Sequence, residues 1–386
     1  MRYLTSGESH GPQLTAIIEG IPAGLELTAE MINEDLKLRQ QGYGRGGRMK
    51  IESDRVEILG GVRHGYTLGS PITLVIKNKD NANWNHVMSV EPIEDHQYEI
   101  KKVPRPGHAD LVGAIKYGHR DLRNILERSS ARETAIRVAV GAVAKQLLKA
   151  LEIQVQGHVQ QIGCVGIENT EFLIQEIRTK IMNSPVRCID ELTSKEMCKQ
   201  IDEAQANGDS LGGIVQILVE NVPAGLGSYV HYDRKLDAKL AAAIISVQSV
   251  KGVHFGDALF GSTHFGSEVH DQIIYDKDGY TRKTNHYGGF EGGMTNGMPI
   301  VMQALIKPIP TLYKPLDSVH IDTQSIEKSM IERSDTCVVP AASVVLEAVV
   351  AIEIATEILS NFNANQMSYL IEEMTAYRKN SKRFEA

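Results

Sequence analysis

Positive charge, aromatic side chains and cysteine are all scarce in this chain, and each shortage argues against a class of protein. The 386 residues carry a formal net charge of −7, which argues against a general binder of nucleic acid or of anionic membranes. Aromatic residues make up 5% of the chain, with a single tryptophan, so rows of stacking aromatics for single-stranded nucleic acid are not expected. The four cysteines form no C-x-x-C pair, which fits a reducing compartment and no disulfide framework or zinc ribbon.

Long apolar runs and metal-binding motifs are absent as well. The first residues lack the apolar stretch of a signal peptide. The most apolar stretch, residues 337–359, is interrupted by proline and glutamate, so it predicts a core helix and not a membrane span. The spacing of His254, His264 and His270 matches no metal geometry, and no H-E-x-x-H, G-x-S-x-G or P-loop motif occurs. We therefore expect a cytoplasmic protein without a metal site.

What the chain does contain is a partial repeat of its first half in its second. Three segments align without gaps and in the same order: residues 11–25 on 212–226, 60–72 on 288–300, and 127–129 on 332–334. A period of about 200 residues is too long for a solenoid unit. The repeat predicts one domain of two lobes, approximately residues 1–200 and 201–386, related by a pseudo-two-fold axis.

The spacing of apolar and polar residues predicts an α+β fold, a layered sandwich of antiparallel sheets and helices. We expect strands at residues 13–20, 49–60, 70–77, 152–165, 213–220 and 299–306, with glycine-rich hairpins over 252–300. We expect helices at 27–41, 109–117, 130–151, 233–246, 323–332 and 340–360, and two more between 170 and 207. Thr28, Ser130 and Thr193 are the expected N-caps. The polar stretch 78–106 is expected to be a long loop, and the C-terminal tail to be solvated.

Arginine is concentrated near the start of the chain. Twelve of the nineteen arginines fall in residues 1–137, which indicates either a pocket for a small anion or a solvated basic face. Arg39, Arg45 and Arg48 lie in a glycine-rich segment that superficially resembles a dinucleotide fingerprint and an RGG box. A helix is expected before it and a strand after it, the reverse of the fingerprint. A clamp for a multiply charged anion fits this segment better.

Two histidines lie next to glycine in expected turns, His10 in the segment 7–11 and His108 in the segment 105–110. Glycine lets the backbone approach a ligand closely, and histidine exchanges protons near neutral pH. The alternatives are solvent-facing turn histidines and, for Asp110, a carboxylate that stabilises a helix start.

Three further segments carry charge beside turns. Arg128, Ser129 and Ser130 precede an expected helix, whose N-terminus either binds phosphate or is simply capped. The matching segment 333–335 adds Asp335, an acid that the first copy lacks, which predicts a place for proton transfer. Residues 307–311, Lys-Pro-Ile-Pro-Thr, are expected to grip a planar heterocycle or its phosphate, or else to be an ordinary strand exit.

Six segments together resemble the chorismate synthase family, and the resemblance spans nearly the whole chain: residues 7–11, 42–48, 105–110, 127–135, 288–297 and 333–336. The resemblance implies an anti 1,4-elimination of phosphate from 5-enolpyruvylshikimate 3-phosphate, which gives chorismate in the shikimate pathway of aromatic amino acid biosynthesis. It implies reduced FMN without net redox change, and a homotetramer. NADPH would be the source of reducing equivalents, used by the chain itself or by a separate flavin reductase.

The resemblance also implies roles for individual residues. Proton transfer would fall to His10, His108 and Asp335. The substrate carries two carboxylates and a phosphate, and the candidates that bind it are Ser9, Arg39, Arg45, Arg48, Arg105 and Arg132. The candidates that bind the flavin are Arg128, Ser129, Ser130, Gln248, Ser249, Gly292, Lys307, Pro308, Ile309, Pro310, Thr311 and Arg333.

Three other functions stay open on the sequence. A non-catalytic anion-binding scaffold predicts no turnover. A different flavin or nicotinamide oxidoreductase predicts net oxidation of its cofactor in each turnover. RNA binding through residues 39–48 predicts a steep salt dependence. Asp335 and the two glycine-flanked histidines favour the elimination over these three.

Overall fold

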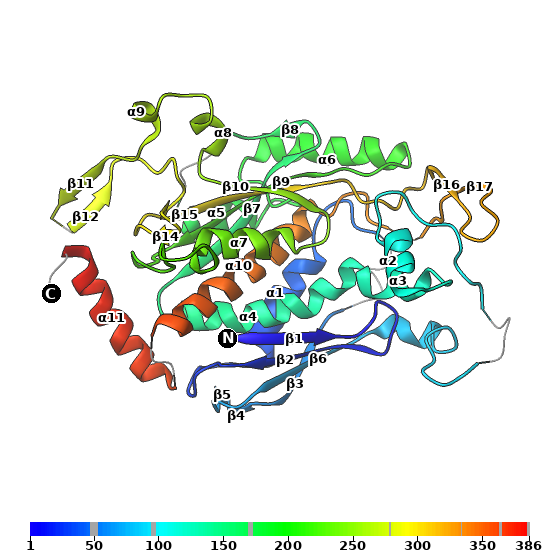
Figure 1. The fold of residues 1–386 in the computed structure, drawn as a ribbon, viewed down its shortest axis with the longest axis horizontal. Coiled ribbons are helices and arrows are strands. Elements are labelled where there is room, and N and C mark those ends of the chain that lie inside the picture. Colours follow the sequence, from blue (N-terminus) through cyan, green and yellow to red (C-terminus); the bar gives the residue numbers. More distant parts are fainter. Residues whose placement is uncertain are drawn as a thin grey trace.

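The chain folds into two antiparallel sheets that enclose a layer of long helices (Figure 1). The computed structural model describes residues 1–46, 53–93, 98–168, 173–277, 279–332, 334–362 and 365–383. One continuous apolar core joins both sheets to the helices between them. The mixed helix and strand content expected from the sequence is confirmed.

The first sheet contains the N-terminal strands. Its order is β1 (Arg2–Ser6), β2 (Gln13–Glu19), β6 (Ile72–Lys77) and β3 (Val56–Gly60). In β2, Leu14, Ala16 and Ile18 are buried and alternate with more exposed residues, so one face of the sheet packs on the helices. The strands expected at 13–20 and 70–77 are confirmed. Of the strand expected at 49–60, only Val56–Gly60 is strand among the described residues.

The second sheet is also antiparallel. Its order is β10 (Val250–Phe255), β15 (Ile300–Ile306), β9 (Gly213–Glu220), β7 (Gln154–Ile162) and β8 (Val165–Gly166). The strands expected at 152–165, 213–220 and 299–306 are therefore confirmed. Four small hairpins or hairpin arms accompany the two sheets: β4 (Val62–Arg63) with β5 (Tyr66–Thr67), β11 (Ile273–Asp276) with β12 (Gly279–Arg282), β13 (Phe290–Glu291) with β14 (Met294–Thr295), and β16 (Asp317–Val319) with β17 (Ile326–Lys328).

Four helices form the layer between the sheets: α1 (Ala29–Gln40), α4 (Thr134–Ala150), α7 (Leu236–Ile245) and α10 (Val339–Asn361). Thr28 caps α1, as expected, by accepting a hydrogen bond from Met31 N. A Cβ atom on Gly141 of α4 would come within 2.3 Å of the Ala348 Cβ on α10. Glycine at this position thus lets the two central helices pack in direct contact.

The remaining helices lie outside this layer. They are α2 (Asp110–Tyr117), α3 (Arg123–Ser129), α5 (Ile174–Ile181), α6 (Glu191–Ala206), α8 (Ala258–Gly261), α9 (Gly266–Val269) and α11 (Met367–Arg383), with 3-10 turns η2 (Lys79–Asn83), η3 (Ala131–Glu133) and η4 (Tyr232–Arg234). In the part of the chain that the structure describes, no helix combines the length and the apolar character that spanning a membrane requires.

Four expectations about these elements are wrong. The segment expected as a helix at 323–332 contains β17 instead, because it pairs with β16. The C-terminal tail is the helix α11, and its Leu370 and Met374 side chains are buried. Helix α6 starts before Thr193, because the Asp190 side chain accepts from Thr193 N. Ser130 caps the 3-10 turn η3 by accepting from Arg132 N, and α4 itself begins only at Thr134.

The two halves share local structure at the positions that the sequence aligns. Thr67 Oγ1 donates to the Pro22 carbonyl at 2.6 Å, and Thr295 Oγ1 donates to the Pro223 carbonyl at 2.6 Å. The strand orders β1-β2-β6-β3 and β7-β9-β15-β10 are equivalent. In each, the strands that come first, second, fourth and third along the chain are neighbours in that order. Strand β7, from the expected first lobe, lies in the sheet of the second.

Candidate active site

The candidate active site surrounds the turn at residues 130–134, which leads into α4. Ser130 Oγ donates to Ser9 Oγ at 3.3 Å. Glu133 accepts from Thr5 Oγ1 at 3.4 Å and from Gln248 Nε2 at 3.3 Å. The N-terminal strand, the segment 7–11 and the segment that follows α7 therefore meet at one turn.

Two buried arginines hold this turn in place. Arg39 donates to Thr134 Oγ1 at 3.0 Å and to the Ala131 carbonyl at 3.0 Å. Arg132 pairs with Asp54 at 2.7 Å, and Asp54 also lies 3.7 Å from Arg39. Burial is the main cause that lowers the pKa of Arg39, to about 9, a value that still leaves it charged at neutral pH. One carboxylate is thus shared by two guanidinium groups.

Asp335 joins the opposite end of the chain to the arginine-rich segment. Its Oδ2 lies 2.8 Å from Arg45 Nη1, and its Oδ1 accepts from Gly46 N at 2.6 Å. The charges of Arg45 and Asp335 both act on Arg39, so this pair lies beside the Arg39–Asp54 cluster. A Cβ on Gly46 would come within 2.6 Å of the Ser334 carbonyl oxygen, which explains a glycine at this close approach.

His10 is bonded to a buried carboxylate. Its Nδ1 lies 2.9 Å from Glu127 Oε1, and its backbone N donates to Glu127 Oε2 at 2.8 Å. Burial alone would raise the pKa of Glu127, but the hydrogen bonds from His10 outweigh burial and hold it below its usual value. A carboxylate only accepts hydrogen bonds, so Nδ1 of His10 carries the hydrogen.

His108 has the same kind of partner. Its Nδ1 lies 2.5 Å from Oδ1 of Asp110, which is fully buried. Arg105 donates to the same carboxylate through Nε at 2.9 Å. Burial alone would raise the pKa of Asp110, but the hydrogen bonds from His108 and Arg105 hold it well below its usual range. Asp110 therefore does more than stabilise the start of α2, since it also orients both side chains.

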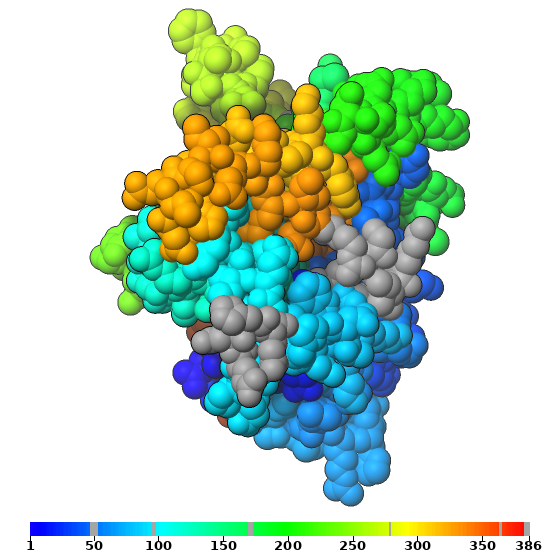
Figure 2. Space-filling view, turned by 90° about the vertical axis from the view of Figure 1, so that its right-hand side faces the viewer, coloured from blue at the N-terminus to red at the C-terminus, as the bar shows by residue number. Residues whose placement is uncertain are grey.

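The segments 105–110 and 307–311 are in direct contact. Arg105 Nη1 donates to Thr311 Oγ1 at 2.8 Å, and Lys307 Nζ donates to the Gly107 carbonyl at 2.8 Å. Figure 2 views this side of the molecule and shows residues near 100–125, in cyan, packed against residues near 310–330, in orange. An ion pair of 2.9 Å between Lys102 and Asp322 adds to that contact.

The region around Lys307 has features that suit a planar anionic cofactor. Burial and the ammonium of Lys251 lower the pKa of Lys307, and a bound phosphate would relieve that repulsion. Lys307 N donates to the carbonyl of Ser249, which has a φ of 70°. Gln248 Oε1 is buried and finds no hydrogen-bond partner among the described residues. A ring N–H donor placed beside Gln248 would satisfy that atom.

The other candidates for flavin binding differ in position. Arg128 donates to the Gly7 carbonyl at 3.0 Å and is exposed, and Ser129 Oγ donates to the Ile125 carbonyl within α3 at 2.8 Å. The Ile309 carbonyl accepts from Ser210 Oγ at 2.7 Å, and Pro308 and Pro310 flank it in the same segment. A Cβ on Gly107 would lie 3.7 Å from Pro310.

One described candidate, Gly292, is not brought into this cluster. Gly292 lies in the turn between β13 and β14, next to the start of α7. That turn precedes β15, whereas Lys307 follows it, so the two candidates lie at opposite ends of one strand. Arg48 and Arg333 fall outside the described residues.

Some neighbours of the candidates were not among the predicted site residues. Glu127 and Asp110 each bind a candidate histidine, and Asp54 is shared by two candidate arginines. Trp84 stacks on His10 with 4.1 Å between ring centroids. Glu127 stands first in the aligned segment 127–129, and Asp110 follows His108 by two residues, so both could have been suspected. Nothing in the sequence separates Asp54 from other acidic residues.

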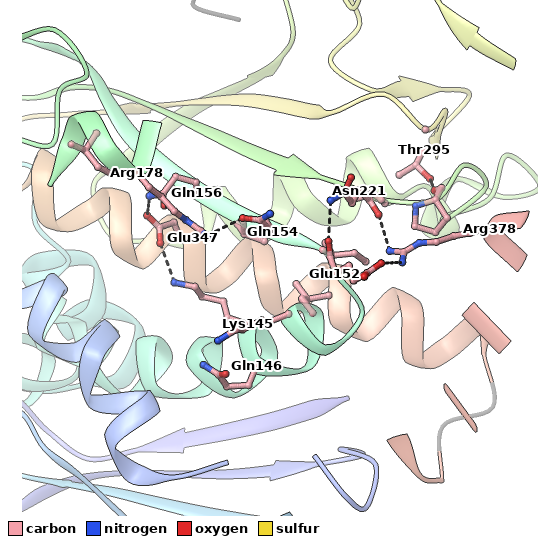
Figure 3. A pocket seen from close by; sticks show the side chains of 18 of the residues that line it. Lys145, Gln146, Glu152, Gln154, Gln156, Arg178, Asn221, Thr295, Glu347 and Arg378 are labelled. Atoms are coloured by element: carbon pink, nitrogen blue, oxygen red, sulfur yellow. Dashed lines mark hydrogen bonds and ion pairs between the residues drawn. The ribbon is translucent and has the colours of Figure 1, made fainter. Parts of the chain in front are cut away.

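A large cavity lies elsewhere, with a volume of about 1920 Å³. It runs along α1, α4, β7 and α10 (Figure 3), and none of the described candidate residues lines it. Its charged side chains are largely paired with one another: Glu347 lies 3.1 Å from Lys145 and 2.5 Å from Arg187. Size alone therefore does not identify the site here.

Comparisons with known proteins agree on one family. A family model described as "Chorismate synthase" matches residues 1–359. The chorismate synthase of Geobacillus sp. (strain WCH70) is 58% identical over 388 residues, and chorismate synthase 2 of Bacillus anthracis is 58% identical over 390 residues; each alignment covers 100% of both chains. A solved structure described as "Crystal Structure of Chorismate Synthase" is 39% identical, with a TM-score of 0.80, and the match covers 99% of this chain and 98% of that one.

Proposed function

Since the chain belongs to the chorismate synthase family, we propose that its reaction takes place at the turn 130–134, where the two halves of the chain meet. The activity is the removal of phosphate from 5-enolpyruvylshikimate 3-phosphate to give chorismate, a carbon–oxygen lyase reaction of the shikimate pathway. The observation that carries the proposed location is the bond from Gln248 Nε2 to Glu133 of this turn, beside Ser249, whose carbonyl accepts from Lys307 N. The segment 307–311 in turn contacts the segment 105–110.

The charge of the site supports a highly anionic substrate. Each buried carboxylate in it is shared by two cationic or protonatable groups: Asp54 by Arg39 and Arg132, Asp110 by Arg105 and His108, and Glu127 by Arg123 and His10. Cations therefore outnumber carboxylates among these described residues. A substrate with two carboxylates and a phosphate would balance the excess. We assign its binding to Ser9, Arg39, Arg45, Arg48, Arg105 and Arg132.

We assign the proton chemistry to three side chains. As the carbon–oxygen bond to phosphate breaks, the leaving oxygen takes a proton from His108 or His10 through Nε2, since Nδ1 of each faces a carboxylate. The Asp335 carboxylate takes the ring proton that leaves from carbon. The departing phosphate gains one proton and the ring carbon loses one, so the elimination needs no further acid or base.

The residues that would hold FMN are Arg128, Ser129, Ser130, Gln248, Ser249, Lys307 and the segment 308–311, with Gly292 and Arg333 as further candidates. The buried Gln248 Oε1 and the neighbouring ammonium groups of Lys307 and Lys251 support this assignment. Reduced FMN, when bound, supplies electron density as phosphate departs and recovers it afterwards, without net redox change. Lys307 would hold its phosphate by charge, and the prolines 308 and 310 would keep that segment rigid.

The proposed roles are tested by turnover with chemically reduced FMN under anaerobic conditions. His108→Asn and His10→Asn should each lower kcat by about 10²- to 10⁴-fold, the usual contribution of a general acid or base. His264→Asn, at an exposed histidine that stacks on Phe260, serves as the matched control and should keep wild-type kcat. Wild-type kcat in either His10→Asn or His108→Asn would remove that histidine from the chemistry.

Several finer features belong to the same proposal. We propose that the chain is one domain that arose by duplication, with lobes of approximately residues 1–200 and 201–386 and a pseudo-two-fold axis between them. The matched bonds of Thr67 and Thr295 support this origin. We also propose a cytoplasmic homotetramer that uses flavin reduced at the expense of NADPH, by its own activity or by a separate flavin reductase.

A further inference from the structure

His10 is enclosed by a ring of three side chains that have not been assigned a role so far. Trp84 stacks on one face of the imidazole, with 4.1 Å between centroids and 31° between planes. Arg123 lies over the Trp84 ring, with its guanidinium carbon 4.9 Å from the centroid. Arg123 Nη1 donates to Glu127 Oε1 at 3.2 Å, and the same oxygen accepts from His10 Nδ1 at 2.9 Å. The contacts thus run from His10 to Trp84, on to Arg123 and Glu127, and back to His10.

The backbone on both sides of the imidazole is fixed as well. Asn81 Nδ2 donates to the His10 carbonyl at 2.8 Å, and Ser9 N donates to the Glu127 carbonyl at 3.0 Å. Asn78 Nδ2 donates to the Gly11 carbonyl at 2.7 Å. The loop 7–11 is therefore tied to the segment 78–84 on one side and to α3 on the other. Neither the His10 imidazole nor the backbone of the loop 7–11 can therefore rotate without breaking hydrogen bonds.

We propose that Glu127, Trp84 and Arg123 are positioning residues for proton transfer by His10, which deepens the function proposed above and rests on it. Glu127 keeps a hydrogen on Nδ1, so any proton exchanged with substrate passes through Nε2. Trp84 supports the ring face and sets the direction of Nε2. Arg123 stacks on Trp84 and holds the Glu127 carboxylate, and its charge keeps that carboxylate ionised.

Several charged groups face the loop that carries His10. Glu127 is 3% exposed and His10 12% exposed, so their attraction is only weakly screened by solvent. Among the described residues, the charged groups that face this loop include Arg123 and Arg128 from α3. Glu8 lies in the loop itself, and its Oε2 lies 3.1 Å from where a Cβ on Gly11 would stand. Although Glu127 is buried, its hydrogen bonds with His10 help to hold its pKa below the usual value.

A fluorescence titration tests this arrangement without any turnover. Trp84 is the only tryptophan of the chain, so its emission in flavin-free protein reports on this site alone. A protonated imidazole quenches a stacked indole more strongly than a neutral one. Emission should therefore rise with pH in one step, and His10→Asn should abolish that step. In Glu127→Gln the midpoint of that step should move to lower pH, since the opposite charge is gone.

A second readout separates positioning from folding. Glu127→Gln should lower kcat roughly 10- to 100-fold, part of the usual acid–base contribution, with little change in KM. Trp84→Phe keeps a ring under His10 and should retain more activity than Trp84→Ala. If Glu127→Gln fails to fold because Arg123 is left unpaired, the double variant Arg123→Gln/Glu127→Gln is compared with Arg123→Gln, and the difference between these two variants carries the same test. Glu91→Gln, exposed on the same loop, is the matched control and should leave midpoint and kcat unchanged.

Two results would overturn the inference. One is an unchanged midpoint in Glu127→Gln, or in the double variant relative to Arg123→Gln, together with an unchanged kcat. The other is equal activity in Trp84→Phe and Trp84→Ala. If instead His10→Asn turns over normally while the midpoint shifts as expected, the proposed role of His10 in the reaction fails but the pairing with Glu127 stands, so the two failures can be told apart.

Discussion

Arg45 and Asp335 form an ion pair of 2.8 Å between Nη1 and Oδ2, although they come from opposite halves of the chain. Asp335 also accepts from Gly46 N at 2.6 Å. The pair is mostly buried, with side chains 11% and 17% exposed. The carboxylate that we propose as acceptor of the ring proton thus lies next to a guanidinium that we propose binds the substrate.

Asp335→Asn is expected to lower kcat by about 10²- to 10⁴-fold, because an amide cannot accept the proton. The amide oxygen can still accept from Gly46 N, and the loss of a negative charge beside Arg45 should leave the anionic substrate bound at least as tightly. Steady-state kinetics separate kcat from KM. The control is Asp202→Asn, which removes the charge from an exposed contact of 2.8 Å with Tyr43 of the segment 42–48. Equal losses in the two variants would show that the segment was merely loosened.

Asp54→Asn is expected to destabilise the fold more than it alters the chemistry. Asp54 is 5% exposed and offsets the charge of two buried arginines, Arg39 and Arg132. Removing one partner of a buried ion pair costs about 3–5 kcal/mol, which should lower the urea midpoint clearly. Arg55→Ala breaks an ion pair with Glu30 in which both side chains are largely exposed, and it should change the midpoint little. A small effect of Asp54→Asn would contradict this view of the cluster.

Lys307→Met is expected to weaken FMN binding about tenfold or more, since a hydrogen bond to a charged group contributes about 1.5–3 kcal/mol. Burial and Lys251 lower the pKa of Lys307, so its charge is lost at a lower pH than that of an ordinary lysine. As the pH rises, the FMN affinity of the wild type should therefore begin to fall at a lower pH than it would with an ordinary lysine, whose pKa is about 10. This step should be missing in Lys307→Met. Flavin titrations at several pH values provide the measurement. Lys314→Met, at an exposed lysine nearby, should bind FMN normally.

Asp110→Asn is expected to change the acid stability of the protein. The pKa of Asp110 lies well below its ordinary value in the folded protein, so below about pH 4 the unfolded chain binds more protons than the folded one. The contribution of Asp110 is therefore complete above about pH 4 and is lost as the pH falls. The stability gap between wild type and Asp110→Asn should narrow in acid. Urea unfolding at several pH values measures it, with Glu372→Gln, at an exposed helix position, as control. A gap that stays constant with pH would contradict the pairing.

The sequence predicted the central elements because they are buried and regular. Strands β2, β9 and β15 and helix α10 were placed within about two residues, the usual uncertainty of element ends, since their apolar residues recur at a clear period. The helix expected at 323–332 failed for a tertiary reason. That segment favours helix locally, but β17 pairs with β16, and pairing overrides local preference.

The C-terminal helix and the carboxylates of the site were missed for different reasons. In α11 the buried side chains of Leu370 and Met374 are spaced by four residues, a helical signal hidden among many polar residues. Glu127 and Asp110 became significant only when the fold brought them to Nδ1 of His10 and His108. A pairing between distant residues, such as Glu127 with His10, cannot be read from local spacing.

The most direct test of the proposed chemistry is a stoichiometry measurement on the wild-type protein. Chorismate, inorganic phosphate and reduced FMN are followed together under anaerobic conditions, with 5-enolpyruvylshikimate 3-phosphate in large excess over the flavin. We predict equal amounts of chorismate and phosphate over many turnovers, while the FMN stays reduced. Loss of reduced FMN in proportion to product, or phosphate release without chorismate, would contradict an elimination that recovers its electrons.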